Sequence, residues 1–292
     1  MMARMTSAVP PRPPLDPSLV RSLLEAPDGP LARVEVVAST GSTNEDVVAA
    51  LRADPDAWPD RSVLVADHQV AGRGRAGRTW ETPAGTALTC TFVLRAPPGG
   101  RSLGWLPLVA GLGAVHALRA TAGVAAALKW PNDLLVPADD ELEGWGPYRK
   151  VGGILTELVP RPDGAAAVVV GVGVNVLQGP AELPVPWATS LALAGARHVD
   201  RLGVLTALVD ALDEVGRRWR DAAGDVAAAG LAGEVADVCA TLGARVAVDL
   251  PGGEVVTGLA SRLDADGALV VSGQNGDERR VLAGDVRHLR VV

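Results

Sequence analysis

The sequence predicts an α+β protein, in which a mixed sheet with helices on one face is followed by a small β-barrel. Expected strands outnumber expected helices, and they cluster without the regular βα alternation that builds a parallel sheet. From residue 242 onward, short apolar runs are separated by the turn signals PGG, DADG and QNGD, as in hairpins. We therefore expect a proline-rich tail with a short helix at 1–32, a first domain at 33–236 and a second at 237–292.

Hydrophobic periodicity locates the elements of the first domain. The predicted helices are 18–25, 44–52, 103–119 and 202–220. The predicted strands are 34–38, 63–67, 86–94, 126–129, 134–136, 151–159 and 168–176. Ser42 and Glu45 stand three residues apart in the pattern of a capping box, so Thr43 and Asn44 are expected at an exposed helix N-terminus.

The second domain is expected to consist of short strands alone. No element is predicted in the alanine- and glycine-rich stretch 222–236 that precedes it. The predicted strands are 245–250, 255–260, 268–271, 279–283 and 288–292.

Composition excludes several classes of partner. The net charge of -7 makes nucleic acid an unlikely main partner, and the N-terminal segment is too short for a helix-turn-helix domain. No apolar run is judged to approach the roughly 20 residues of a membrane helix, and no secretory signal is recognised. Cys90 and Cys239 form neither a disulfide framework nor a metal-binding spacing, and Cys90 is expected to be buried. We therefore expect a cytoplasmic protein without a membrane or nucleic-acid partner.

The segment GRGRAGRTW at 72–80 is the most informative part of the chain. Glycine permits unusual backbone conformations, and arginine supplies forked donors that suit carboxylate or phosphate. In an acidic chain, three arginines within six residues indicate a mobile loop that closes over a small anion. The loop also matches the dinucleotide pattern G-x-G-x-x-G, but TWETPAGT follows it in place of a helix, so we reject that interpretation.

Lysine is nearly absent from the sequence. Of the 27 basic residues only Lys129 and Lys150 are lysines, in the segments KWPNDLL and RKVGGILTE. KWPNDLL alone is typical of a turn between two strands, because proline, asparagine and aspartate are turn formers. Together they indicate a ligand site in which glycines leave room against a strand. The glycines of GVGVN at 171–175 are equally compatible with ligand access and with close strand packing.

The order of these motifs resembles the biotin protein ligases. The resemblance spans about 33 to 292 and rests on five elements: STN at 42–44, Gln69 before the loop at 72–80, KWPNDLL at 129–135, KVGGIL at 150–155 and GVGVN at 171–175. The C-terminal AGDVRHLR is similar to the end of the family's small SH3-like domain. The family's catalytic domain is related to class II aminoacyl-tRNA synthetases, which implies the α+β fold expected above.

The resemblance implies a two-step ligase reaction. The biotin carboxylate attacks the α-phosphate of ATP, giving biotinyl-5′-adenylate and pyrophosphate. A lysine amine of a biotin carboxyl carrier protein then takes the biotinyl group, and AMP leaves. Mg²⁺ is expected to arrive with ATP, held mainly by phosphate and water with no dedicated protein site. A monomer or a homodimer is expected.

The resemblance also assigns residues to the two substrates. Lys150 and Arg75 are the expected catalytic cations, with Lys150 bridging the biotin carboxylate and the α-phosphate. The residues expected around biotin are Ser42, Thr43, Asn44, Gln69, Gly72, Arg73, Gly74, Arg75, Lys150, Gly152 and Gly153. The residues expected around ATP are Arg73, Arg75, Arg78, Trp80, Lys129, Asn132, Asp133, Lys150 and Asn175. Asn175 is expected at the adenine edge, and Trp187 is a candidate either for stacking on the purine or for ordinary core packing.

Two features depart from the family pattern. Residues 137–149, PADDELEGWGPYR, form an acidic insertion that is either a solvated hairpin or a contact for the acceptor protein. The run KVGGIL also has glycine where alanine is common in the family. Two other functions compete: a lipoate or octanoate ligase, which KWPND and GRGRAGRTW argue against, and a non-catalytic biotin- or nucleotide-binding protein, which the retained lysines and loop arginines argue against.

Overall fold

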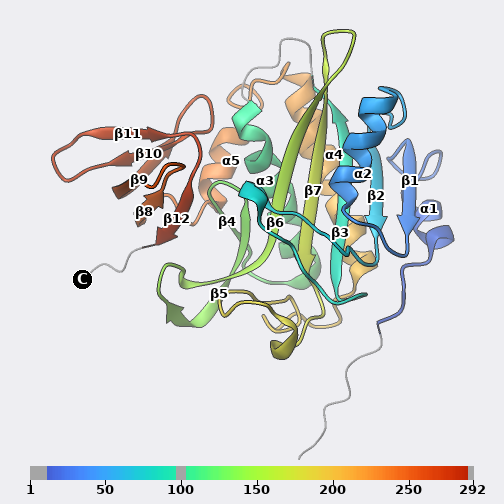
Figure 1. The fold of residues 1–292 in the computed structure, drawn as a ribbon, viewed down its shortest axis with the longest axis horizontal. Helices are drawn as coiled ribbons and strands as arrows, with labels where there is room; N and C mark the ends of the chain where they lie inside the picture. Colours follow the sequence, from blue (N-terminus) through green and yellow to red (C-terminus); the bar gives the residue numbers. More distant parts are fainter. Residues whose placement is uncertain (1–11, 97–102, 289–292) are drawn as a thin grey trace, which may run out of the picture.

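The protein contains a seven-stranded mixed sheet and a separate five-stranded antiparallel sheet. We describe a computed structural model, which covers residues 12–96 and 103–288. The helices are α1 (Pro17–Leu24), α2 (Thr43–Ala53), α3 (Leu106–Ala122), α4 (Arg201–Asp221) and α5 (Leu231–Val238), with 3-10 turns at Arg75–Gly77, Leu103–Trp105 and Pro180–Glu182. Figure 1 shows the larger sheet at the centre of the molecule and the smaller sheet beside its β4 edge.

The larger sheet runs in the order β1-β2-β3-β7-β6-β5-β4. Its strands are β1 (Arg33–Val37), β2 (Ser62–Ala66), β3 (Ala87–Arg95), β4 (Ala127–Lys129), β5 (Asp133–Leu142), β6 (Gly146–Pro160) and β7 (Ala166–Asn175). β1 and β2 are parallel, and each of the other neighbouring pairs is antiparallel. The predicted mixed α+β sheet is therefore confirmed.

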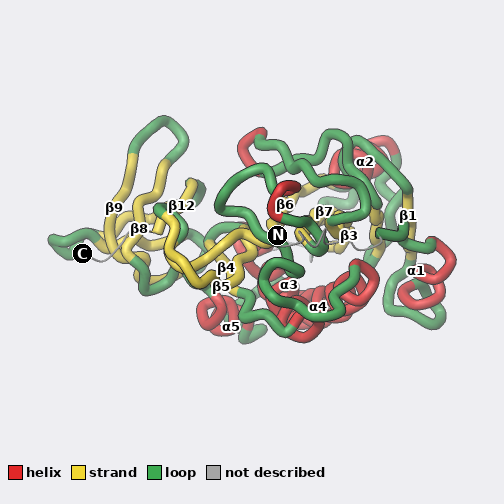
Figure 2. Tube along the Cα trace, turned by 90° about the horizontal axis from the view of Figure 1, so that it is seen from below, coloured by secondary structure: helices red, strands yellow, loops and turns green. Residues whose placement is uncertain are grey.

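Helices cover both faces of this sheet. The long helices α3 and α4 pack together on one face with α5, and Figure 2 shows α2 on the opposite side. Strand alternation explains the division: Val63 and Val65 join the main core, whereas Leu64 points to a smaller cluster around Val47 and Leu51 of α2. The prediction of helices on one face thus describes the long helices, and α2 adds a second layer.

α3 is the most apolar helix of the protein. By length and composition alone, residues 103–122 form a helix that could cross a membrane, with 67% of that segment buried. The expectation that no apolar run reaches this length was therefore wrong. The burial comes from close packing: a Cβ at Gly111 would lie 2.5 Å from Leu128 Cδ1, and one at Gly113 would lie 3.0 Å from Leu212 Cδ2. These glycines bring β4 and α4 against the helix, as in a core helix.

The smaller sheet has the strand order β11-β10-β9-β8-β12. Its strands are β8 (Arg245–Asp249), β9 (Val255–Leu263), β10 (Leu269–Ser272), β11 (Glu278–Val281) and β12 (Asp285–His288). This all-antiparallel sheet fits the expected small SH3-like domain. The last strand was predicted at 288–292 but the structure places it at 285–288, and the residues after 288 lie outside the described part of the chain.

Two tryptophans of the first domain connect it to this smaller sheet. Trp105 Nε1 donates to Ala265 O at 3.1 Å, and Trp130 Nε1 donates to Gly267 O at 3.0 Å. α5 begins inside the stretch for which no element was predicted, where alanine and glycine obscure its apolar face, and it ends two residues beyond that stretch. The predicted domain boundary at 237 falls inside α5 and stays a prediction.

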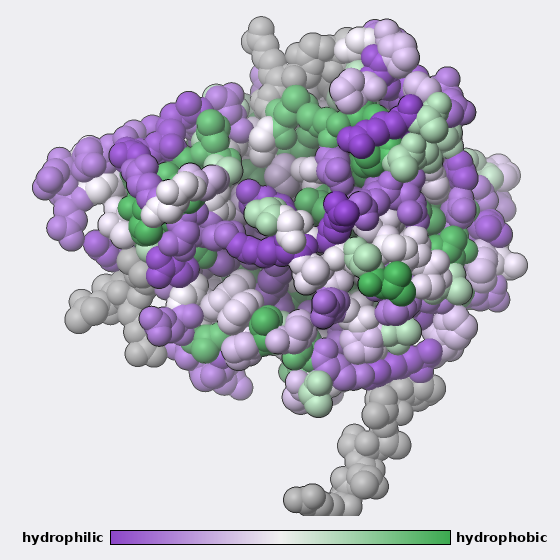
Figure 3. All heavy atoms as spheres, viewed as in Figure 1, coloured by the Kyte–Doolittle hydropathy of each residue, from purple (hydrophilic) through white to green (hydrophobic). Residues whose placement is uncertain are grey.

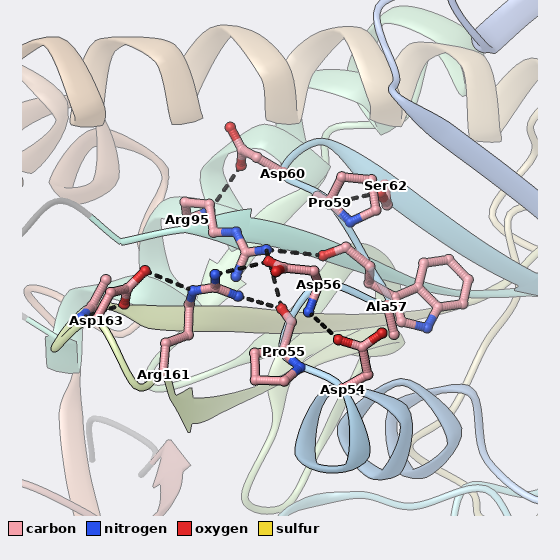
Figure 4. A network of polar contacts seen from close by, with 12 residues as sticks. Asp54, Pro55, Asp56, Ala57, Pro59, Asp60, Ser62, Arg95, Arg161 and Asp163 are labelled. Atoms are coloured by element: carbon pink, nitrogen blue, oxygen red, sulfur yellow. Dashed lines mark hydrogen bonds and ion pairs between the residues drawn. The ribbon is translucent and has the colours of Figure 1, made fainter.

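A polar network fixes the loop that follows α2. Arg161 and Arg95 converge on this loop in Figure 4, where Arg161 reaches Asp56, Asp163 and the carbonyl of Pro55. Arg95 Nη2 donates to the carbonyls of Pro55 and Trp58, both at 3.3 Å. These contacts tie the end of β3 and the β6–β7 turn to one loop.

Candidate active site

One cavity of about 560 Å³ collects nearly all of the predicted site residues. It lies between the loop at 72–80, the start of α2, strands β5 to β7 and the C-terminal β12. Figure 3 shows the face of the molecule seen in Figure 1. Strongly hydrophilic side chains gather in the middle of that face, between the two sheets. Of the residues predicted to bind biotin or ATP, only Gly72 and Gly152 do not line the cavity.

The loop at 72–80 is a short hairpin. Trp80 N donates to Gly72 O at 2.8 Å, and Gly74 N donates to Arg78 O at 2.7 Å. Gly77 has φ of +73°, in the left-handed region that glycine enters without strain. A Cβ at Gly72 would lie 2.4 Å from Trp80 O, so glycine at this position lets the two ends of the hairpin approach each other closely.

The three loop arginines point in different directions. Arg73 pairs with Glu45 of α2 at 2.6 Å, and Arg78 pairs with Asp285 of β12. Arg75 Nη1 donates to Asn132 Oδ1 at 3.2 Å. Burial lowers the pKa of Arg75, while nearby carboxylates oppose the shift. Arg75 is therefore the partly buried cation that the loop supplies to the cavity.

One end of the cavity is polar. Thr43 donates to Gln69 Oε1 through its backbone N at 2.8 Å and its hydroxyl at 3.0 Å. Ser42 and Thr43 are both buried. The capping-box prediction was wrong, because the Ser42 side chain makes no cap hydrogen bond and Glu45 pairs with Arg73 instead. The α2 N-terminus is thus turned into the cavity.

Asn44 lies behind this polar end. Its Nδ2 donates to Leu155 O at 3.1 Å and to Glu157 Oε1 at 3.2 Å, and Thr91 Oγ1 lies 2.6 Å from its Oδ1. A Cβ at Gly171 would lie 2.3 Å from the same Oδ1, so this glycine makes room for the amide. Asn44 therefore braces the polar end through protein contacts, a role that its position in STN did not indicate.

Lys150 occupies the centre of the cavity. Its Nζ lies 2.6 Å from Asp133 Oδ1 and 6.0 Å from the centroid of the Trp80 ring. A Cβ at Gly153 would lie 3.6 Å from Lys150 Nζ, so that glycine keeps the space beside the ammonium open. At Gly152 a Cβ would instead lie 2.5 Å from Gly173 O, which makes Gly152 a strand-packing residue.

Trp80 closes the loop over β7. A Cβ at Gly173 would come within 2.7 Å of the indole, so the glycine lets the ring lie against the strand. The glycines of GVGVN therefore accommodate the side chains of Asn44 and Trp80. Asn175, at the end of this strand, is buried, with Nδ2 donating to Thr189 O at 2.9 Å and Oδ1 accepting from Gln178 at 2.8 Å.

Lys129 lies at the other end of the cavity and is only 5% exposed. Its Nζ is 3.8 Å from the ring centroid of Trp145, a cation–π contact. Burial lowers its pKa to about 8, and Asp133 opposes that shift. Trp145 in turn stacks on Trp187, with centroids 6.0 Å apart. Trp145 was not among the predicted site residues, although a tryptophan between two glycines in an acidic segment was a usable signal.

Three carboxylates in or beside the cavity form ion pairs. Asp133, Asp285 and Glu45 pair with Lys150, Arg78 and Arg73, respectively. Within residues 12–96 and 103–288, no group of three or more His, Cys, Asp or Glu side chains is arranged to hold a metal ion.

Comparisons with known proteins place the chain in one class, the biotin and lipoate protein ligases. Residues 36–175 match the biotin/lipoate A/B protein ligase family, and residues 241–289 match the biotin protein ligase C-terminal domain. The biotin--[acetyl-CoA-carboxylase] ligase of Mycobacterium tuberculosis is 38% identical over 283 residues, covering 96% of this chain and 97% of that protein. The chain therefore belongs to the biotin protein ligase family.

Further relatives agree with this assignment. The Aquifex aeolicus biotin protein ligase, solved in complex with biotin and ATP, superposes with a TM-score of 0.68 at 27% identity, covering 89% of this chain and 100% of that one. The bifunctional ligase/repressor BirA of Escherichia coli is 32% identical over 148 residues, which is 51% of this chain and 41% of that protein.

Proposed function

We propose that this protein is an ATP-dependent ligase that forms biotinyl-5′-adenylate and transfers biotin to a lysine of a biotin carboxyl carrier domain. The observation that carries the proposal is one cavity with a polar end at Ser42, Thr43 and Gln69 and two cations, Lys150 and Arg75, at its centre. A small ligand with a polar ring and a carboxylate tail fits this order of groups. ATP then meets the carboxylate from the Lys129 side.

The first step brings two anions together. Without fixed cations the biotin carboxylate and the α-phosphate repel each other, and preorganised charge reduces that cost. We assign Lys150 the bridging role, and Asp133 holds its ammonium at 2.6 Å until the ligands arrive. Arg75, whose Nη1 donates to the neutral amide of Asn132, is the second cation available to an anionic ligand.

The polar end suits the ureido ring of biotin. Its donors and acceptors need matched partners, because a buried polar group without one costs affinity. Ser42, Thr43 and Gln69 present hydroxyl and amide groups there, while Asn44 holds the start of α2 in place. Gly153 leaves the space beside Lys150 for the tail of the ligand.

ATP is assigned to the side with Lys129 and the tryptophans. Lys129 and Arg78 supply positive charge near the phosphates, and Asn132 and Asp133 orient Arg75 and Lys150. Trp187 is 37% exposed and lines the cavity, which favours stacking on the purine over core packing. Mg²⁺ enters as part of the MgATP substrate, held by phosphate oxygens and water.

In the second step the mixed anhydride has to be protected from water until the carrier lysine arrives. The hairpin at 72–80 covers the cavity, with Trp80 against β7 at one end and Arg78 on Asp285 at the other. We assign this hairpin the role of a lid. The acidic net charge favours a protein acceptor over nucleic acid, and we retain a cytoplasmic monomer or homodimer as the working state.

The proposal is tested by incubating purified protein with biotin, MgATP and a biotin carboxyl carrier domain and reading transfer with streptavidin. We expect label on the carrier, dependent on both ATP and biotin. A parallel reaction with lipoate in place of biotin, read by mass spectrometry, separates the two ligase functions. Transfer of lipoate and not biotin would replace the proposal with the lipoate ligase, and nucleotide and biotin binding without transfer would indicate a binding protein.

A further inference from the structure

The insertion hairpin (residues 137–149) carries a tryptophan into the cavity. β5 and β6 run on into this hairpin, and at its tip Trp145 N donates to Leu142 O at 2.9 Å. Gly144 and Gly146, on either side of the tryptophan, have φ of +78° and +59°, in the left-handed region. The turn therefore has a glycine on each side of Trp145, and its backbone geometry determines the position of the indole.

The tip of the insertion hairpin is anchored to the C-terminal sheet. His288 N donates to Gly144 O at 3.0 Å, and Tyr148 meets the His288 ring edge-on, with centroids 6.4 Å apart. In Figure 1 the hairpin lies below the C-terminal strands, at the lower end of β5 and β6. Trp145 lines the cavity, whereas Tyr148 is not among the lining residues.

Trp145 and Trp187 form a parallel pair of rings. Their planes differ by 10° and their centroids are 6.0 Å apart. Neither indole belongs to the buried core clusters, whereas four of the seven tryptophans do. Trp187 is fixed beside Lys150, since Lys150 N donates to Trp187 O at 2.8 Å. The two indole rings therefore line the cavity and are not part of the hydrophobic core.

We propose that Trp145 is a purine-specificity residue that stacks on the adenine ring of ATP opposite Trp187; this rests on the proposed ligase function. Parallel indoles suit a flat base, because both faces of a purine stack on aromatic rings. A base between two rings needs about 7 Å, twice a contact distance of about 3.5 Å. The two centroids are now 6.0 Å apart, so the rings have to separate as the base enters.

Charge fixes which end of ATP meets the rings. Lys129 Nζ lies 3.8 Å from the Trp145 centroid, and Lys150 also lines the cavity. The exposed side chains of Asp139, Asp140 and Glu143 make the outer part of the hairpin negative. Phosphates are therefore repelled from the hairpin and drawn to the lysines, which leaves the base for the indoles.

The test compares Trp145→Ala and Trp145→Phe in biotin-dependent ATP–pyrophosphate exchange. We expect Trp145→Ala to raise the KM for ATP about tenfold, equivalent to about 1.4 kcal/mol, with kcat and the KM for biotin within about twofold of wild type. Trp145→Phe restores most of the affinity, because it keeps an aromatic plane. The preference for ATP over CTP narrows in Trp145→Ala, since a pyrimidine offers less stacking area.

Tyr148→Ala is the matched control, because it removes an aromatic ring from the same hairpin at a position outside the cavity. The backbone bond from His288 N to Gly144 O still anchors the tip in this variant, so we expect its KM for ATP to remain at the wild-type value. An unchanged or lower KM for ATP in Trp145→Ala overturns the stacking role, and equal losses in Trp145→Ala and Tyr148→Ala reduce it to a hairpin-folding effect. Failure of the wild-type protein to catalyse biotin-dependent exchange is a different result, and it counts against the ligase function itself.

Discussion

Two groups of cations in this protein use the same chemistry for different ends. Arg95 and Arg161, far from the cavity, direct donors to backbone carbonyls of the loop after α2 (Figure 4). The cations at the cavity pair with side chains from separate elements, as Arg78 does with Asp285 and Lys150 with Asp133. A backbone carbonyl stays where the fold puts it, whereas a side-chain partner can be exchanged for a ligand anion. Arg161 also pairs with Asp56 and Asp163, so it is the additional carbonyl contacts that distinguish the fold-holding arginines from Arg78 and Lys150.

The largest effect is expected at Lys150. In Lys150→Ala the central cation is lost, and removal of one preorganised charge-stabilising group lowers rates by about 100- to 1,000-fold. Single-turnover formation of biotinyl-5′-adenylate, followed by mass spectrometry, measures this directly. Adenylate formation at the wild-type rate would refute the bridging role of Lys150.

Arg75→Ala is expected to weaken the hold on the intermediate. The loop then retains its hairpin and its Arg78 contact but loses its partly buried cation. We expect release of the adenylate to rise about tenfold, the effect of about 1.4 kcal/mol, with lysines of an unrelated protein becoming biotinylated. Streptavidin detection on bulk albumin measures this, with Arg161→Ala as the matched arginine control. If Arg75→Ala labels its acceptor as selectively as the wild-type protein does, the loop does not retain the adenylate.

Because the pKa of Lys129 is lowered, we expect ATP binding to depend on pH. Its pKa is lowered to about 8 by burial, so the ammonium is present below that pH and is lost as the pH rises through it. We expect the KM for ATP to rise above pH 8 in the wild-type protein. In Lys129→Arg the charge persists to higher pH, and the rise should disappear. Parallel profiles for the two proteins would show that another group titrates.

The smallest effect on activity is expected at Arg95. Arg95→Ala leaves the carbonyls of Pro55 and Trp58 without this donor, which costs about 2 kcal/mol in the free energy of unfolding. Because the network lies outside the cavity, kcat/KM at a temperature below the transition should equal that of wild type. Urea unfolding measures the free energy of unfolding, and exchange kinetics on the same sample measure kcat/KM. A large loss of kcat/KM in Arg95→Ala would show that the two groups of cations are not functionally distinct.

Motifs with a local chemical meaning could be interpreted from sequence. The two scarce lysines and the glycine–arginine loop indicated the cavity, because charge and backbone freedom are properties of the residues themselves. The family, the fold class and the enzyme class are confirmed by the relatives. Cys90 is buried, as its apolar strand indicated.

Long-range contacts could not be predicted in this way. Ser42 and Glu45 fit a capping box, but Glu45 pairs with Arg73, which folds back from 28 positions along the chain. Gly152 and Gly153 are neighbouring residues of the same type, yet Gly152 packs on Gly173 whereas Gly153 faces Lys150. Trp145 reaches the cavity because the hairpin tip pairs with His288, which is far away in the sequence. Each of these outcomes depends on which distant segment arrives beside the residue.

Biotin-dependent ATP–pyrophosphate exchange, measured without acceptor on wild type, Lys150→Ala and Arg95→Ala together, tests the central claim most directly. We predict exchange that requires biotin in the wild-type and Arg95→Ala proteins, and loss of that exchange in Lys150→Ala with the protein still folded. Exchange in Lys150→Ala equal to that of wild type, or exchange that does not depend on biotin, would contradict the account.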